Sequence, residues 1–134
     1  MEHPKPGAPY ALHAGDGWTY GFGPNFVVKA GELAQGRRLA VVEYTTHAGE
    51  EPGDHTHETE DEIFYLVKGS LGFRCGGAEF ELEDGGFMFL PRGIEHGYTI
   101  RSSGEARILL ITSPADESAS GGWGGLIGNL EAGT

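Results

Sequence analysis

Several kinds of residue are scarce in this sequence, and each shortage excludes a class of protein. Cys75 is the only cysteine, so no disulfide can form within the chain, which fits a reducing cytoplasm. Lysine and arginine together number nine against twenty acidic residues, and the net charge is −11. Because such a surface repels phosphate groups, we expect neither nucleic acid nor an anionic membrane as a partner.

Long apolar runs are also missing. No segment approaches the length needed to span a membrane, and the polar, proline-rich residues 1–9 lack the apolar core of a signal peptide. We therefore expect a cytoplasmic protein. Its 134 residues suffice for one domain with one hydrophobic core.

Glycine, by contrast, is abundant, with 24 residues. Glycine and proline clusters separate short segments in which side chains alternate in polarity, the pattern of β-strands joined by tight turns. The expected strands are residues 26–29, 39–46, 62–67, 70–75, 79–82, 86–90, 97–101 and 107–112. Strands this short and this regularly interrupted predict an all-β antiparallel sandwich or barrel.

The two ends of the chain differ in composition from the middle. Residues 1–25 form a predicted arm, whose aromatic rings would pack on the barrel or on a second subunit because exposed rings promote aggregation. Residues 26–115 form the predicted barrel domain, and residues 116–134 a glycine-rich tail. A capping serine before proline, at Ser113, predicts a short C-terminal helical segment.

Four residues are potential ligands of a metal: His55, His57, Glu62 and His96. Three imidazoles and one carboxylate form a complete set of protein ligands for a divalent transition metal. His55 and His57 share one face of an extended segment, whereas Glu62 has the opposite parity, so residues 58–61 must turn. Neighbouring acids are alternative carboxylate ligands: Glu58, Glu60 and Asp61.

The glycines and proline around these ligands have a distinctive spacing. The first stretch reads Gly49, five residues, His55, one residue, His57, four residues, Glu62, six residues, Gly69. The second reads Gly85, five residues, Pro91, four residues, His96. Over residues 26–115 the chain resembles a small single-domain cupin that carries both cupin motifs.

The resemblance implies a double-stranded β-helix, the cupin jelly-roll barrel. It also implies that His55, His57, Glu62 and His96 bind one divalent transition metal per chain: Fe, Mn, Ni, Co or Zn. Ile100 stands where the family commonly has a structural asparagine, a departure that does not touch the ligands. Because cupins are commonly dimers, we expect a homodimer with residues 1–30 and 118–130 at its interface.

Within the cupins, residues 39–43, 61–65 and 87–93 most resemble the quercetin dioxygenase-like proteins. This resemblance implies a metal-dependent dioxygenase acting on a small flavonol-like, enol or phenolic substrate. Glu62 would be catalytic, binding the metal and accepting the substrate hydroxyl proton. Two alternatives stay open: a redox-neutral isomerase or polyketide cyclase that uses the same metal, and a non-catalytic cupin that only binds a small molecule.

Other side chains receive simpler predictions. The expected walls of the cavity are Val41, Phe64, Leu66, Phe73, Tyr98 and Ile100, with either Phe87 and Phe89 or Met88 and Leu90. The second face of residues 62–67, also apolar, is expected to be covered. The acids between Glu50 and Glu62 are expected to form a solvated rim, and His47 a surface position.

Overall fold

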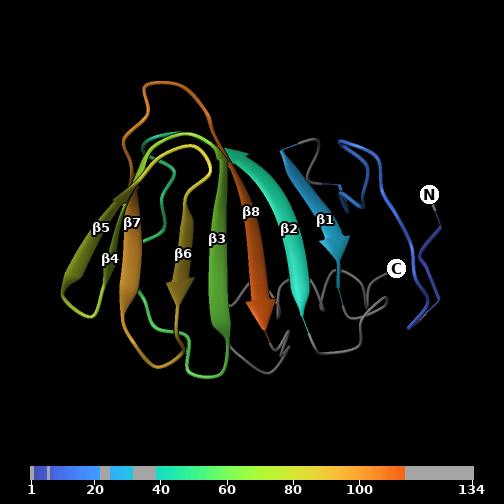
Figure 1. Cartoon of the computed structure of the whole chain (residues 1–134), viewed down its shortest axis with the longest axis horizontal. Helices are drawn as coiled ribbons and strands as arrows, with labels where there is room; N and C mark the ends of the chain where they lie inside the picture. The colour runs from blue at the N-terminus through green and yellow to red at the C-terminus, as the bar shows by residue number, and fades with distance from the viewer. Residues whose placement is uncertain (1, 6, 22–24, 32–38, 114–134) are drawn as a thin grey trace.

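The computed structural model describes residues 2–5, 7–21, 25–31 and 39–113 (Figure 1). Its strands are β1 (Phe26–Ala30), β2 (Ala40–Thr46), β3 (Asp61–Lys68), β4 (Leu71–Cys75), β5 (Ala78–Leu82), β6 (Phe87–Leu90), β7 (His96–Ile100) and β8 (Ala106–Ser113). Every expected strand is present, and each end lies within one residue of its predicted position. The predicted C-terminal helical segment and the tail fall outside the described residues.

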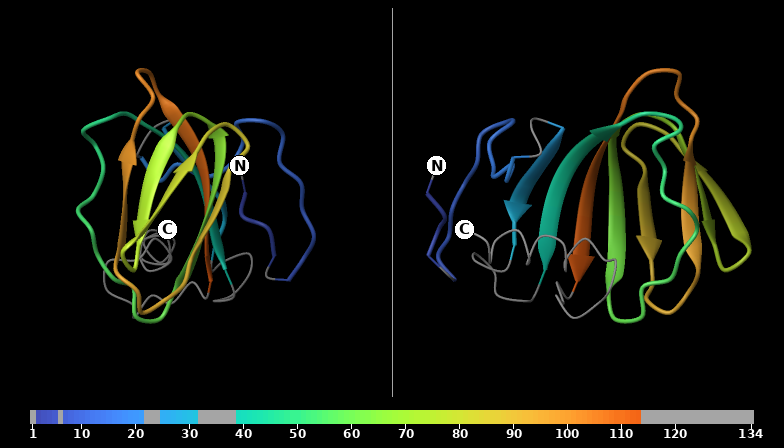
Figure 2. Two further views of the ribbon diagram at one scale, coloured as in Figure 1. Left: turned by 60° about the vertical axis from the view of Figure 1, so that its left-hand side comes forward. Right: turned by 180° about the vertical axis from the view of Figure 1, so that it is seen from behind.

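The strands form two antiparallel sheets that face each other. One sheet has five strands in the order β1-β2-β8-β3-β6, and the other has three in the order β5-β4-β7. Figure 2 shows the two layers with the strands of each sheet side by side. The all-β, double-sheet barrel that the resemblance implied is therefore confirmed for the described chain. Within that part of the chain, no helix is long and apolar enough to cross a membrane.

The core lies between the sheets because side chains alternate along each strand. Val42 on β2, Leu110 on β8 and Phe64 on β3 are cross-strand neighbours and all point inward. Phe64 then meets the second sheet, where its ring centroid lies 5.2 Å from that of Phe73 and 5.5 Å from that of Tyr98. This aromatic cluster joins the two layers of the barrel.

The register decides which face of β6 points inward and corrects two other predictions. Phe87 and Phe89 point outward with 58% and 47% of their surface exposed, whereas Met88 and Leu90 are buried. Val41 is also on the outer face of its sheet, where it lines a groove of about 1220 Å³ between the sheet and the N-terminal arm. The outer side of β3 was expected to be covered, but Tyr65 and Val67 on that side are exposed.

The N-terminal arm packs on the barrel, which is one of the two arrangements that the sequence predicted. Trp18 exchanges backbone hydrogen bonds with Val28 at 3.0 and 2.9 Å, and its side chain packs against the core. The close approach requires glycine at position 17, because a Cβ there would lie 2.5 Å from the Val28 carbonyl oxygen. The Tyr10 hydroxyl adds a hydrogen bond to the Lys29 carbonyl at 2.7 Å.

Candidate metal centre

Two of the predicted ligands lie on strands of opposite sheets. Glu62 is the second residue of β3, where it pairs with Thr112 of β8 and Leu90 of β6 and points into the barrel. His96 begins β7 and points inward from the facing sheet, two residues before the buried Tyr98. Regular strand alternation therefore aims both side chains at the same interior point.

The other two ligands, His55 and His57, lie on the segment between β2 and β3, residues 47–60. This segment runs beside β7, because His55 and His96 exchange backbone hydrogen bonds at 2.9 and 2.8 Å. The carbonyl of His57 accepts a further bond, from the Gly93 amide at 2.8 Å. Residues 58 and 59 bend the chain before β3, which confirms the predicted turn between His57 and Glu62.

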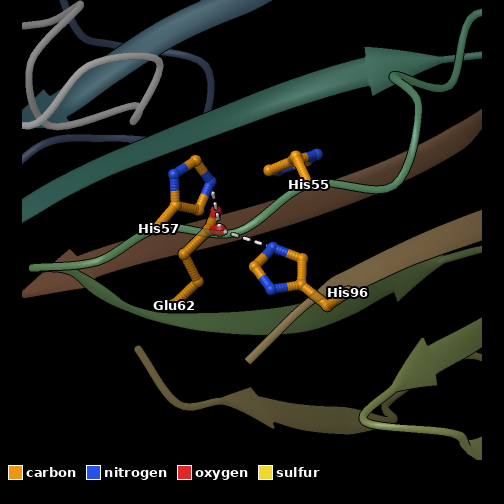
Figure 3. Close-up of side chains that lie close together, drawn as sticks. All are labelled: His55, His57, Glu62 and His96. Carbon is orange, nitrogen blue, oxygen red and sulfur yellow. Dashed lines mark ion pairs between the residues drawn. The ribbon is translucent and has the colours of Figure 1, made fainter. Parts of the chain in front are cut away.

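The four side chains converge inside the barrel (Figure 3). One ligand atom from each residue lies within 4.8 Å of all the others. Glu62 Oε1 lies at the centre, 2.9 Å from His57 Nε2 and 3.1 Å from His96 Nε2. The His55 ring lies 4.6 and 4.7 Å, between centroids, from those of His57 and His96.

Backbone carbonyls orient two of the imidazoles. The Nδ1 atom of His55 lies 2.7 Å from the Gly53 carbonyl oxygen, and that of His96 lies 3.3 Å from the Ile94 carbonyl oxygen. An Nδ1–H that donates to a carbonyl leaves the Nε2 lone pair free for a metal. Both rings are thus held in the tautomer that ligation requires.

The electrostatics of the cluster favour an ionised carboxylate. Burial alone would raise the pKa of Glu62, but its contacts with His57 and His96 outweigh burial and lower the pKa to about 2. The same contact with Glu62 raises the pKa of His57, and the charge of Glu60 adds to this effect. Glu62 is therefore an anion at neutral pH, although only 2% of its surface is exposed.

The donor set fits a divalent cation. Glu62 Oε1 and His96 Nε2 are fully buried and approach each other without hydrogen-bond geometry. Buried polar atoms without a hydrogen bond destabilise the folded state unless another interaction compensates for the lost hydration. A cation bound among the four donors would provide that interaction. Three imidazole nitrogens and one carboxylate oxygen are ligands that Fe, Mn, Ni, Co and Zn accept. The cluster can hold one such ion.

The neighbouring acids divide into three environments. Asp61 points away and forms a bidentate ion pair with Arg92, at 3.0 and 3.1 Å, and Glu58 is exposed. Glu60, expected on the solvated rim, is instead 1% exposed. Its burial was missed because the turn before β3 breaks the alternation on which the prediction depended. His47 is exposed beside Glu50, so its surface position is confirmed.

Comparisons with known proteins agree with this geometry. The family model described as "Cupin domain" matches residues 42–112, more than half of the chain. Quercetin 2,3-dioxygenase of Bacillus subtilis (strain 168) is 30% identical over 103 residues. That match covers 75% of this chain but 30% of the dioxygenase, so the chain spans less than a third of that relative.

Solved structures share the fold. TT1209 from Thermus thermophilus is 29% identical, with a TM-score of 0.55, over 65% of this chain and 83% of that protein. A predicted oxalate decarboxylase from Thermotoga maritima is 20% identical, with a TM-score of 0.61, over 66% and 78%. KdgF from Halomonas sp. is 24% identical, with a TM-score of 0.56, over 68% and 80%. The last two likenesses show the fold alone.

Proposed function

This chain belongs to the cupin family, and we propose that it is a metal-dependent dioxygenase for a small flavonol-like, enol or phenolic substrate. The observation that carries the proposal is the convergence of four donor atoms within 4.8 Å inside the barrel. The identity shared with a quercetin 2,3-dioxygenase supports the choice of reaction. The proposed ligands are His55, His57, Glu62 and His96.

Burial around the cluster favours one direction of approach for a substrate. His57, Glu62 and His96 are all less than 5% exposed, whereas His55 is only partly buried. A small oxygen-bearing molecule would therefore reach the centre on the side of His55. A metal that prefers five or six ligands would have one or two coordination positions left for the substrate beside the four protein donors.

The residues have separate roles in the proposed reaction. The three histidines hold and orient the metal, which when bound supplies Lewis acidity toward a hydroxyl or keto oxygen. Glu62 lies among the proposed ligands, and one of its carboxylate oxygens accepts the substrate hydroxyl proton. Apolar side chains, among them Phe64 and Tyr98, keep water out of the interior beyond the ligands.

The reaction is tested with protein loaded separately with Fe²⁺, Mn²⁺, Ni²⁺ and Co²⁺. Quercetin is added under air while an oxygen electrode follows dioxygen and absorbance follows the flavonol. For protein loaded with at least one of these metals, we expect dioxygen and flavonol to be consumed at the same time. Matched controls are the chelator-treated protein and the His57→Ala variant, in which both rates should fall to background.

Two outcomes would contradict the dioxygenase. Conversion of the flavonol at the same rate under strict anaerobiosis would assign redox-neutral Lewis-acid chemistry to the metal. Binding of quercetin to metal-loaded protein, with the flavonol recovered unchanged under air, would assign a non-catalytic binding function.

We propose in addition that the chain forms the expected homodimer. A contribution of residues 1–30 to its interface stays a prediction, residues 118–130 lie outside the described residues, and a further apolar face lies on β3 and β6. Tyr65, Phe87 and Phe89 lie on one outer sheet face, where Tyr65 and Phe87 are cross-strand partners, and each is more than 40% exposed. Exposed aromatic side chains gathered in this way favour association. Light scattering should give twice the chain mass of 14.3 kDa, and a monomeric mass would contradict the proposal.

A further inference from the structure

The segment that carries His55 occupies the edge of the three-stranded sheet. β7 is the end strand of that sheet, so its outward amide and carbonyl groups need partners. The segment supplies them at two points: His55 exchanges backbone bonds with His96, and the Glu51 carboxylate accepts the Ile100 amide at 2.9 Å. Within the described residues, a single bridge pair fixes His55, so its backbone lacks the continuous ladder that holds Glu62.

Arg74 on β4, the strand beside β7, forms hydrogen bonds with the same segment. Arg74 of β4 donates to both carboxylate oxygens of Asp54, at 2.7 and 3.2 Å. Its third nitrogen donates to the Thr99 hydroxyl of β7 at 2.8 Å. Arg74 thus ties together two strands and the residue immediately before His55, in a bidentate geometry that fixes the orientation of the pair although both side chains are partly exposed.

The backbone of β7 leaves room for this contact. A Cβ on Gly97 would lie 2.0 Å from Asp54 Oδ1 and 3.0 Å from Arg74 Nη2. Any larger residue at position 97 would therefore displace the carboxylate. The glycine lies directly after His96, so the Asp54 contact and the metal ligand are neighbours on one strand.

We propose that Asp54, Arg74 and Gly97 form a latch that positions His55 for the metal, an inference that rests on the proposed metal centre. The latch is defined by these three residues. It fixes the backbone before His55, so the imidazole is already in place when the ion arrives. Outer-shell groups that orient a ligand typically raise metal affinity about 10–100-fold. Because Asp54 directly precedes His55 in the chain, the effect is concentrated on this ligand.

The test measures Co²⁺ affinity by competition with a chelator. Arg74→Met removes the guanidinium and keeps the aliphatic stem, and we expect affinity to fall about tenfold. The matched control is Arg101→Met, which breaks a bidentate pair with Glu81 at 3.0 and 3.4 Å on the same sheet, away from His55. The control should keep the affinity of the unaltered protein.

Two double variants separate positioning from a general loss of structure. In a His55→Ala background, Arg74→Met should cause no further loss of Co²⁺ affinity, because the ligand that the latch positions is already gone. Gly97→Ala alone should weaken binding, whereas Gly97→Ala with Asp54→Ala should match Asp54→Ala alone. Equal losses from Arg74→Met with and without His55 would overturn the latch.

Hydrogen exchange of the metal-free protein keeps the latch distinguishable from the function. We expect the His55 amide, which donates to His96, to exchange faster in Arg74→Met and at the unaltered rate in Arg101→Met. If the unaltered protein binds Co²⁺ and Arg74→Met binds it equally well, the latch is wrong while the metal centre stands. If the unaltered protein binds no divalent transition metal, the proposed function fails, and the role of the latch in metal binding fails with it.

Discussion

Glu62 and His96 reach the metal centre from strands, whereas His55 and His57 reach it from an irregular segment. The strand residues are fixed by continuous ladders and are 2% and 3% exposed. The segment is fixed by a few side-chain and backbone contacts, and His55 on it is only partly buried. One half of the site is thus a consequence of the fold, and the other half depends on individual contacts that can be removed one at a time.

The largest expected effect is on the fold that carries the strand half. Phe73 is 1% exposed, and its ring contacts Phe64 of the facing sheet and Tyr98 of its own sheet. Phe73→Ala should lower the free energy of unfolding by about 3–5 kcal/mol, measured by urea titration of the metal-free protein. The adjacent variant Arg74→Met should lower it far less, because an exposed ion pair contributes up to about 1 kcal/mol. Similar losses in both variants would remove the distinction between the halves.

The second prediction concerns chemistry at the strand half. Glu62→Gln keeps the shape of the side chain but removes the anion that accepts the proton. In metal-loaded protein, turnover should fall about 10²–10⁴-fold, the usual contribution of a general base. Metal content must be measured alongside, since the variant also loses a charged ligand. Unchanged turnover in a fully loaded variant would exclude Glu62 as the base.

The third prediction compares one ligand from each half directly. His96→Ala should weaken Co²⁺ binding more than His55→Ala does. Removing His96 leaves the carboxylate of Glu62 buried with one partner fewer, whereas water can replace the partly exposed imidazole of His55. Competition titrations of both variants measure the difference. A larger loss of Co²⁺ affinity in His55→Ala than in His96→Ala would contradict the view that the strand residues hold the metal more firmly than the segment does.

The smallest expected effect lies in the core, away from the segment. The Tyr44 and Tyr98 hydroxyls lie 3.2 Å apart, and burial together with Tyr98 raises the pKa of Tyr44 well above its ordinary value. The folded protein therefore holds this proton more tightly than the unfolded chain. Its contribution is complete below about pH 10 and is lost as the pH rises further.

Tyr44→Phe removes this titration and one hydrogen bond. At pH 8 the variant should lose about 1 kcal/mol of unfolding free energy. Above about pH 10 its stability should fall less steeply than that of the unaltered protein. Urea titrations of both proteins at pH 8 and at several pH values above about 10 give the slope of unfolding free energy against pH for each protein. Equal slopes in the two proteins would contradict the raised pKa of Tyr44. Co²⁺ affinity at pH 8 should not change.

Alternation of side chains was enough to predict the eight strands and the facing of Glu62 and His96. It failed at β6, where all four residues are apolar and either face could be inward. It failed also at the outer side of β3, because an apolar pattern does not say whether a partner covers it. The register with β3 resolved both, placing Phe87 and Phe89 on the exposed side with Tyr65.

The contacts that hold the segment could not be predicted at all. Asp54 and Arg74 are 20 residues apart, and Arg74 and Thr99 are 25 apart. Pairs at such distances leave no periodic trace in the sequence, and each residue alone is an ordinary surface residue. The ligands were predictable because their spacing is shared by a family, whereas the groups that position His55 were visible only in the structure.

Elemental analysis of the purified protein beside its His57→Ala variant tests the central claim most directly. We expect about one divalent transition-metal ion per chain in the unaltered protein and a marked loss in the variant, with both proteins folded. A protein that takes up no such metal after reconstitution would contradict it, and so would a variant that keeps the same metal content.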